Sequence, residues 1–317
     1  MLRDNVDRPA VTSTHTNSRS GEYMAGELRR LLTDGGIHFL MEAHSGVSAK
    51  IVAETGFSAI WASGLTMSAS LGLRDANEAS WTQVLDIVEC MTDAVEIPVL
   101  VDGDTGYGNF NSVRRLVLKL CQRGVAGVCL EDKLFPKTNS FIGENQELAD
   151  PLEFTGKIKA AKDSQLFADF CVVARVEALI ANRGLREALH RAELYRGAGA
   201  DAILIHSKQS NGCEIFEFLR EWAGRSPTVI VPTMYPTVPT PRFKDAGVSA
   251  VIWANQNLRA SIAAMRSVSQ EIYLASAIAS SEELLPKVKE IFALTNEPEL
   301  AVAEKKYLPS VVGTGIK

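Results

Sequence analysis

The 317-residue sequence predicts an α/β protein of the (β/α)8 barrel class with extra helices at its C-terminal end. Two observations favour this class. Eight short runs of aliphatic and β-branched residues recur along the chain, and helical segments separate them. Each run is almost continuously apolar, as expected for parallel strands that helices cover on the outside. A doubly wound sheet is the weaker alternative.

The strands are expected in order at residues 37–43, 59–64, 98–104, 127–132, 171–178, 201–207, 228–234 and 250–255. Between them, segments such as WTQVLDIVECMTDAV and NSVRRLVLKLCQRG repeat apolar residues every three or four positions, which indicates amphipathic helices. A helix is also expected at MAGELRRLL, before the first strand. After the last strand, LRASIAAMRSVSQEI and SEELLPKVKEIFALT predict helices that cap the barrel or bind another subunit.

We expect one domain over residues 21–317, consisting of the barrel and a C-terminal helical arm, after a disordered tail over residues 1–20. The tail is polar and lacks the apolar segment of a secretory signal. Its Asp4 and Asp7 argue against a transit peptide. The final SVVGTGIK is expected to be frayed.

The composition is that of a globular protein, with 46% hydrophobic and 22% charged residues. The formal charge of −5 argues against a basic surface that binds nucleic acid. No apolar run approaches the roughly 18 residues of a membrane span. The five cysteines form no CxxC pair, and Cys121, Cys129 and Cys171 lie in or beside apolar segments. Buried thiols and a cytoplasmic location are therefore expected.

Polar residues gather where the predicted strands end. These ends carry Glu42 and His44, Ser63 and Gly64, Asp102 and Asp104, Glu131 and Asp132, Arg175 and Glu177, His206 and Ser207, and Asn255. Because the C-terminal ends of barrel strands meet at one face, where such enzymes hold their active sites, the pattern predicts an enzyme. No P-loop, Gly-x-Ser-x-Gly or GxGxxG motif precedes a suitable helix, which excludes NTPase, hydrolase-elbow and dinucleotide readings.

Three carboxylates of this set predict a metal site. Asp102 and Asp104 are two residues apart, so on a strand both would point to the same side, and Glu131 ends the next strand. Carboxylates this close repel one another unless a cation neutralises them. Oxygen ligands without a cysteine cluster favour Mg²⁺ or Mn²⁺ over Zn²⁺. Alternatively, the two aspartates only cap a turn in DGDTGYGN.

The segment 131–151 is a long polar loop of the kind that often covers an active site. Its Lys133 and Lys137 would bring positive charge over the barrel mouth, where Arg175 and His206 also converge. Together they predict a site for phosphate or carboxylate. The alternatives are that Lys133 pairs with a neighbouring carboxylate, that Lys137 is a solvated surface lysine, and that His206 is a hydrogen-bonded core histidine.

The same loop carries a resemblance to a known family. EDKLFPKTNS (131–140) matches the pattern Glu-Asp-Lys-x-x-Pro-Lys-x-Asn-Ser at every fixed position. Further agreement comes from WASGL (61–65), GLRDANE (72–78), VDGDTGYGN (101–109), VARVEA (173–178) and DAILIHSK (201–208). From about Gly36 to Pro309, the sequence resembles the phosphoenolpyruvate mutase family of the isocitrate lyase/phosphoenolpyruvate mutase superfamily.

The resemblance implies a (β/α)8 barrel that uses Mg²⁺, with Mn²⁺ as a possible substitute, to interconvert phosphoenolpyruvate and phosphonopyruvate. The phosphoryl group moves from the enol oxygen to C3, which makes the C–P bond of phosphonate biosynthesis. The resemblance also implies a homo-oligomer, dimer or tetramer, with a C-terminal helix exchanged between barrels. Phosphonopyruvate is the uphill product in this family, so an enzyme that consumes phosphonopyruvate is an expected functional partner.

The resemblance assigns roles to residues by motif position. Asp102 would be the main metal ligand, Asp104 and Glu131 would act largely through water, and Asp75 would support the metal's solvent shell. The pyruvyl carboxylate and oxygen would be held by backbone amides around Ser63, Gly64 and Leu65, with Trp61 packing nearby. The phosphoryl group would be held by Arg175, His206 and Asn139, and the loop would close with help from Lys133 and Lys137.

Three other functions compete with this one. A phosphonopyruvate hydrolase would cleave the C–P bond with water; hydrolases of the family differ in the loop, where this sequence keeps Asn139. A carbon–carbon lyase of the superfamily would need a Lys-Cys-Gly-His loop with a catalytic cysteine, and the corresponding loop here has no cysteine. A barrel that serves only as a scaffold would have lost one or more site groups, whereas every motif residue is present.

Overall fold

The computed structural model describes residues 17–143 and 146–309, in which eight parallel strands close into a barrel in chain order. The strands are β1 His38–Ala43, β2 Ala59–Ala62, β3 Val99–Asp102, β4 Gly127–Glu131, β5 Cys171–Val176, β6 Ala202–Ile205, β7 Thr228–Ile230 and β8 Ala250–Trp253. The barrel closes where β8 pairs with β1, His38 opposite Ala250. Each strand lies inside its predicted run. The barrel class is confirmed, and the doubly wound alternative is wrong.

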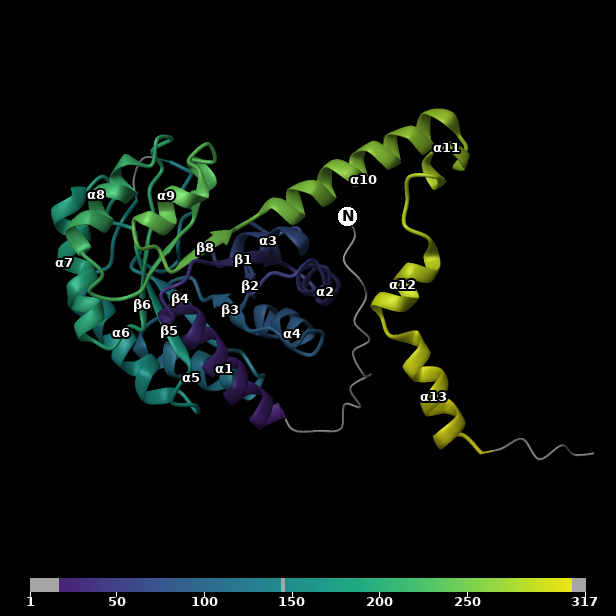
Figure 1. The fold of residues 1–317 in the computed structure, drawn as a ribbon, viewed down its shortest axis with the longest axis horizontal. Helices are drawn as coiled ribbons and strands as arrows, with labels where there is room; N and C mark the ends of the chain where they lie inside the picture. The colour runs from purple at the N-terminus through teal and green to yellow at the C-terminus, as the bar shows by residue number, and fades with distance from the viewer. Residues whose placement is uncertain (1–16, 144–145, 310–317) are drawn as a thin grey trace, which may run out of the picture.

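Helices surround the barrel (Figure 1). They are α2 Gly46–Thr55, α3 Gly64–Ser70, α4 Trp81–Thr92, α5 Phe110–Gln122, α6 Pro151–Ser164, α7 Gly184–Gly197, α8 Cys213–Trp222 and α9 Thr240–Asp245, with a short 3-10 turn, η1, at Pro232–Met234. Local sequence sets several of their starts. Ser80 and Gln83 form a capping box at α4, and Asp150 caps α6 just before Pro151, whose missing N–H costs nothing in a first turn.

The first helix, α1 Asn17–Thr33, contains the predicted MAGELRRLL helix but begins before the predicted boundary at residue 21. Residues 1–16 of the predicted tail lie outside the described residues. Leu28, Leu31 and Leu32 of α1 belong to the apolar cluster inside the barrel. A Cβ added at Gly127, where β4 begins, would meet Leu28 at 2.8 Å. Helix α1 therefore closes the barrel at the end where the strands begin, leaving the opposite end for chemistry.

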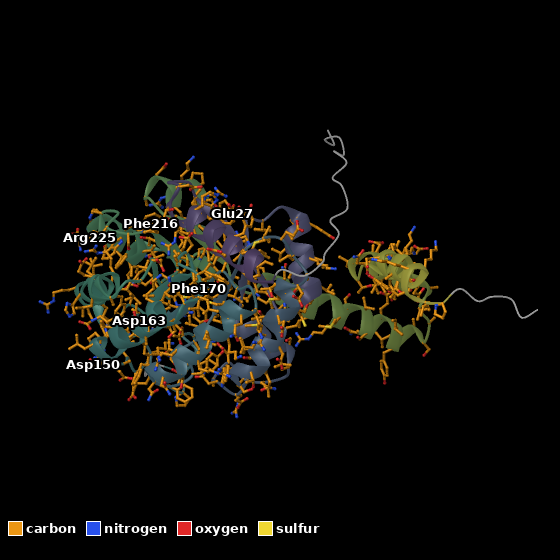
Figure 2. The ribbon with its side chains drawn as sticks, turned by 90° about the horizontal axis from the view of Figure 1, so that it is seen from below. Glu27, Asp150, Asp163, Phe170, Phe216 and Arg225 are labelled. Atoms are coloured by element: carbon orange, nitrogen blue, oxygen red, sulfur yellow. The ribbon has the colours of Figure 1, made fainter. Side chains whose placement is uncertain are left out.

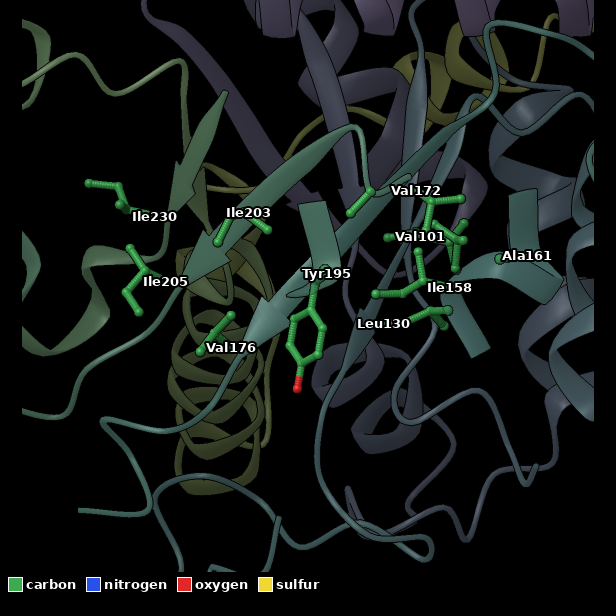
Figure 3. Packing of buried hydrophobic residues seen from close by; sticks show 14 of the residues in the cluster. Val101, Leu130, Ile158, Ala161, Val172, Val176, Tyr195, Ile203, Ile205 and Ile230 are labelled. Atoms are coloured by element: carbon green, nitrogen blue, oxygen red, sulfur yellow. The ribbon is translucent and has the colours of Figure 1, made fainter. Parts of the chain in front are cut away.

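The core has two layers because successive strand residues point to opposite sides. Inside the barrel lie residues such as Leu100, Val173 and Leu204. Between strands and helices lies the larger cluster, part of which Figure 3 shows, with Val101, Leu130, Val172 and Ile203 on strands beside Ile158 and Tyr195 on helices. Figure 2 shows Phe170 within the fold and charged side chains such as Asp150 and Arg225 around its outside. This rigid frame fixes the strand ends.

Four helices follow the barrel: α10 Gln256–Ala275, α11 Ala279–Glu282, α12 Val288–Leu294 and α13 Glu297–Tyr307. The predicted helix over 281–295 is interrupted between α11 and α12, where Pro286 lacks an N–H and clashes with the preceding turn. Helix α10 projects from the barrel (Figure 1), and the end of α12 lies beside α2, where Nζ of Lys50 donates to the carbonyl oxygen of Leu294. Residues 310–317, expected to be frayed, lie outside the described part of the chain. Over the described ranges, every helix is too short or too polar to cross a lipid bilayer.

Candidate active site

A pocket lies at the carboxyl ends of the strands, where the sequence places its polar residues. Its walls include most of the predicted site residues: Trp61, Ser63, Leu65, Asp75, Asp102, Glu131, Lys137, Asn139, Arg175 and His206. Gly64, Lys133 and Asp104 are not part of the lining but lie directly behind it. The lining also includes Thr138, Ser140, Phe141, Val231, Thr233, Ala254 and Asn255. Of these additional residues, only Asn255 was among the polar strand-end residues found in the sequence.

Asp102 and Asp104 come together, although not as a strand pair. Strand β3 ends at Asp102, and Asp104 has a left-handed backbone with φ of 50°, so the strand alternation that was used to pair them is wrong. A Cβ added at Gly64 would lie 3.0 Å from Oδ1 of Asp104 and 3.2 Å from Oδ2 of Asp102. A larger residue at this position would press on both carboxylates and require them to shift. Asp102 also accepts from the backbone N–H of Asp104 at 3.3 Å, as the turn-capping alternative expected.

Acid outweighs base around Asp104. Burial, together with Asp102, Asp75 and Glu131, raises the pKa of Asp104 to about 7, although Lys137 opposes the shift. Burial also raises the pKa of Glu131, against the pull of Arg175. Oε1 of Glu131 is buried and has no hydrogen-bond partner among the described residues. An additional cation at this place would be stabilised by these groups.

Whether the carboxylates suit a metal ion depends on what already lies between them. Nζ of Lys137 is 2.5 Å from Oδ1 of Asp104 and 2.7 Å from Oδ1 of Asp75. Within the described ranges, no three His, Cys, Asp or Glu side chains converge closely enough to hold a metal by themselves. Asp102 lines the pocket, and within the described part of the chain it forms no ion pair with a lysine or arginine. The donor set therefore fits an ion such as Mg²⁺, which binds one or two carboxylates and keeps several waters.

Lys137 is buried, with its side chain only 5% exposed, so the solvated-surface alternative is wrong. Burial alone would lower its pKa, but Asp104, Asp102 and Asp75 raise the pKa of Lys137 well above its ordinary value. Its ammonium group is therefore charged at neutral pH. It sits in the pocket wall, where it faces both the carboxylates and any bound anion.

Glu177 is a site residue that sequence reasoning listed at a strand end but gave no role. Its carboxylate accepts from Nε of Arg175 at 2.5 Å and from Oγ of Ser140 at 2.7 Å, and it lies 2.9 Å from Nδ1 of His206. Despite complete burial, Arg175 and His206 hold the pKa of Glu177 well below its ordinary value. The signal was its position two residues after Arg175, just beyond the end of β5. This buried anion fixes the cations of the site.

Arg175 and His206 lie side by side, with NH2 of Arg175 2.9 Å from Nδ1 of His206. Burial and the nearby Arg175 lower the pKa of His206, although Glu177 opposes the shift, so the neutral ring is favoured. The other ring nitrogen, Nε2, is buried and has no partner among the described residues. Nδ1 of His206 is therefore hydrogen-bonded within the protein, as the core-histidine alternative expected, whereas Nε2 can bind a ligand.

Lys133 lies behind the pocket and not over its mouth. It is 1% exposed and donates to the carbonyl oxygen of Thr138 at 2.9 Å and to Oγ of Ser140 at 2.8 Å. Its Nζ is also 3.4 Å from Glu177, the carboxylate pairing that the alternative expected. Lys133 thus holds the loop from beneath, which is consistent with a part in loop closure but not with direct contact with the ligand.

Asn139 bonds within the protein. Its Nδ2 donates to Oδ2 of Asp75 at 2.6 Å, and its Oδ1 accepts from the backbone N–H of Phe141 at 2.9 Å. The amide therefore lies over the pocket and spans from the loop to the segment after α3. Its predicted contact with a phosphoryl group stays a prediction, as do the ligand and metal roles of the other site residues.

Two strand-end residues stabilise the contacts between strands and helices and do not line the pocket. Glu42 accepts from the backbone N–H groups of Asn257 and Leu258, so it caps the first turn of α10. Asp132 accepts from the phenol of Tyr195 at 2.7 Å and from Arg191 at 3.0 Å, which ties β4 to α7. Both carboxylates are buried, and polar character at a strand end does not distinguish such residues from site residues.

The fold and this site define a (β/α)8-barrel enzyme that binds a small anion beside a carboxylate cluster. A family model described as phosphoenolpyruvate phosphomutase matches residues 28–273. The phosphoenolpyruvate phosphomutase of Tetrahymena pyriformis is 57% identical over 283 residues, 89% of this chain and 94% of that protein. The chain belongs to the phosphoenolpyruvate phosphomutase family, and the family expected from the loop motif is confirmed.

Solved structures agree with this placement. The phosphoenolpyruvate phosphomutase of Streptomyces platensis subsp. rosaceus superimposes with a TM-score of 0.88 at 41% identity, covering 90% of this chain and 99% of that one. A phosphonopyruvate hydrolase in complex with oxalate and Mg²⁺ gives a TM-score of 0.85 at 38% identity, with the same coverage. The fold is thus shared by mutase and hydrolase, and the two functions must be separated by chemistry.

Proposed function

We propose that this chain interconverts phosphoenolpyruvate and phosphonopyruvate by moving a phosphoryl group between the enol oxygen and C3. The relatives with this name are 47–57% identical over most of the chain. The observation that carries the proposal is that one pocket combines two kinds of group. Its lining includes Lys137, Arg175 and His206, and also the carboxylates Asp102 and Glu131.

The cationic side chains and His206 suit a phosphoryl group. Arg175 is permanently charged, and its planar guanidinium matches phosphate oxygens. His206 can donate from Nε2 in either of two states, the imidazolium or the neutral tautomer whose Nδ1 accepts from Arg175. Asn139 would exchange its bond to Asp75 for one to the phosphoryl group. None of these groups needs to act as a nucleophile, because phosphoryl transfer depends mainly on positioning and on neutralised charge.

The carboxylates of the site suit Mg²⁺, with Mn²⁺ as a possible substitute. Asp102 would bind the ion directly, while Asp104, Glu131 and Asp75 would hold its waters. When bound, the ion would supply positive charge to the enolate oxygen. The backbone N–H groups around Ser63, Gly64 and Leu65, at the start of α3, would bind the pyruvyl carboxylate. The buried Trp61 would limit where the planar pyruvyl group can lie.

The reaction balances without any added group. The O–P bond breaks, negative charge collects on the enolate oxygen, the C2 carbonyl forms, and C3 makes the new bond to phosphorus. Lys137 and Arg175 stabilise the charge on the phosphoryl oxygens during the transfer. Water has to be kept from phosphorus, because its attack would give pyruvate and phosphate. The loop over the pocket, with Thr138, Asn139 and Phe141 in its lining, would exclude it.

The other functions are less well supported. A hydrolase would use the same anion site, and what speaks against it is the loop amide of Asn139 in place of a group that activates water. A lyase would need a cysteine, and residues 131–151 contain none. A scaffold without activity would not need a buried arginine and lysine at a pocket, since buried charges are costly even when they are paired.

The setting of the reaction is also proposed. Helix α10 has no buried residue, and the side chains of Tyr273 and Leu284 on the arm are 83% and 80% exposed. A second barrel that covers the arm would bury such surface, as expected for a dimer or tetramer that exchanges C-terminal helices. A phosphonopyruvate-consuming enzyme would draw the reaction in the unfavourable direction. We expect both enzymes in the cytoplasm.

A coupled assay tests the proposal. Purified protein is given Mg²⁺ and phosphonopyruvate, and NADH oxidation by lactate dehydrogenase is followed with and without pyruvate kinase and ADP. A mutase makes phosphoenolpyruvate, so NADH is consumed only when pyruvate kinase and ADP are present. NADH consumption without pyruvate kinase would mean that pyruvate is released directly, which would favour the hydrolase.

A further inference from the structure

Asn77 lies outside the pocket lining, yet it joins two parts of the site. It belongs to the segment between α3 and α4, which also provides Asp75. Its Oδ1 accepts from the backbone N–H of Lys137 at 2.7 Å, and its Nδ2 donates to Oδ2 of Asp104 at 2.8 Å. One carboxamide therefore connects the loop over the pocket to the carboxylate cluster beneath it.

The chemistry of the two partners fixes how the carboxamide is oriented. A backbone N–H can only donate, and an ionised carboxylate can only accept. Only one orientation of Asn77 satisfies both, with its oxygen towards Lys137 and its nitrogen towards Asp104. A serine could not span the two partners in this way, and an aspartate would place a second carboxylate against Asp104. The position requires a neutral side chain with a donor and an acceptor.

These bonds complete a closed ring. Asn77 holds the backbone of Lys137, the ammonium group of Lys137 contacts Oδ1 of Asp104 at 2.5 Å, and the other oxygen of Asp104 returns to Asn77. Breaking the Asn77 corner removes the hydrogen bond that holds the backbone N–H of Lys137, while the ion pairs of its flexible side chain remain. The backbone of Asn77 is left-handed, with φ of 58°, which asparagine tolerates better than most residues.

We propose that Asn77 is a positioning residue that holds the loop residues 133–143 down on the carboxylate cluster, so that Lys137 stays against the phosphoryl group and water stays out. This inference rests on the proposed mutase function. Asn77 touches neither substrate nor metal in this account. It acts through Lys137 and Asp104, and its loss should change the course of the reaction as well as its rate.

The test replaces Asn77 by glycine, which keeps the left-handed backbone and removes the carboxamide. Asn182→Gly is the matched control, because Asn182 is also left-handed, with φ of 55°, and is exposed in the segment between β5 and α7. With Mg²⁺ and phosphonopyruvate, Asn77→Gly should lower kcat by about 100-fold, as expected for a misplaced catalytic group. A larger share of its turnovers should end in pyruvate and phosphate, whereas Asn182→Gly should match the wild type.

A second readout does not depend on turnover. Trypsin can cut after Lys133 and Lys137, so the rate of cleavage in the loop, in the presence of Mg²⁺ and oxalate, reports how firmly the loop is held. Cleavage should be several-fold faster in Asn77→Gly than in the wild type or in Asn182→Gly. Wild-type cleavage and product ratio in Asn77→Gly would overturn the inference, as would a slower reaction without either change.

The outcomes separate this inference from the proposed function. A wild-type protein that makes no phosphoenolpyruvate contradicts the proposed function, whereas a wild-type mutase whose Asn77→Gly variant is unchanged contradicts only the role of Asn77. Should Asn77→Gly fail to fold, Asn77→Asp decides, since it keeps the shape and the acceptor for Lys137 but loses the donor to Asp104. A folded Asn77→Asp protein with wild-type kcat and product ratio would overturn the inference.

Discussion

Arg175, Lys137 and Glu177 are charged side chains that the protein buries, and each is stable there only because an oppositely charged group lies beside it. Glu177 contacts Arg175 and lies near Lys133, while Lys137 contacts Asp75 and Asp104. Removing one member of a buried pair usually costs about 3–5 kcal/mol because the other charge is left unpaired. Substitutions at these positions would therefore lower stability and activity together. Residues with fewer ion pairs give clearer tests of activity alone.

Asp102 is such a residue. Asp102→Ala should abolish turnover, with a loss of at least about 100-fold in kcat, because it removes the proposed direct ligand of the ion that stabilises the enolate. Folding should persist, and the thermal unfolding midpoint of the metal-free variant checks this. Asp163→Ala, at an exposed carboxylate of α6, is the control and should keep full activity. Full activity in Asp102→Ala would remove the metal assignment.

Asp104 predicts a dependence of stability on pH. Its pKa is raised from 3.8 to about 7, so the folded protein binds this proton more tightly than the unfolded chain. The contribution of Asp104 to the free energy of unfolding therefore falls as the pH rises from 3.8 to about 7. Asp104→Asn does not titrate, so its unfolding midpoint should rise relative to the wild type between pH 4 and pH 7, measured in EDTA. A difference that stays constant with pH would contradict the shift.

The same residues show the reach of sequence reasoning. Asp102 and Asp104 were placed together correctly, but by a strand rule that fails because β3 ends at Asp102. Lys133 was expected over the mouth and lies behind the pocket, since charge alone does not say on which side of a loop a lysine folds. Asn77 and Glu177 received no role, because their roles depend on partners that are remote in sequence, such as Lys137 and His206.

At the scale of elements, the strands were the most predictable part. Their apolar runs are nearly continuous because helices cover them, and every strand lies within its run. Helix boundaries were less predictable: α1 begins earlier than the composition suggests, and Pro286 divides one expected helix into α11 and α12. Helix α13 was missed, since its sequence EPELAVAEKKY carries only a weak apolar stripe.

The arm of α10 to α13 makes a prediction about assembly. Truncation after Ser276 removes α11, α12 and α13, and should lower the molar mass of the assembly in solution because it removes the apolar surface through which we propose that two barrels pair. Light scattering measures the mass. Phe292→Glu tests the same surface without deletion, by placing a charge on a half-exposed apolar position. An unchanged mass in both variants would contradict exchange of the arm between subunits.

For the whole molecule, the net charge of −5 gives little information about the ligand. The barrel brings Lys137, Arg175 and His206 to one mouth among several carboxylates, so cationic groups can face an anion although neither the site nor the whole chain has an excess of positive charge. The fold class and the family could be predicted from sequence because runs and motifs are local features. Which of the polar side chains line the pocket and which lie behind it could not be predicted, since this depends on how the loops at the strand ends meet.

The most direct test of the account is the fate of phosphorus in one reaction. Phosphorus NMR of purified protein with Mg²⁺ and phosphonopyruvate resolves the phosphonate, the enol phosphate and inorganic phosphate as separate signals. The account predicts that the phosphonopyruvate signal declines as phosphoenolpyruvate grows, with little inorganic phosphate. Inorganic phosphate accompanied by pyruvate, without phosphoenolpyruvate, would contradict it.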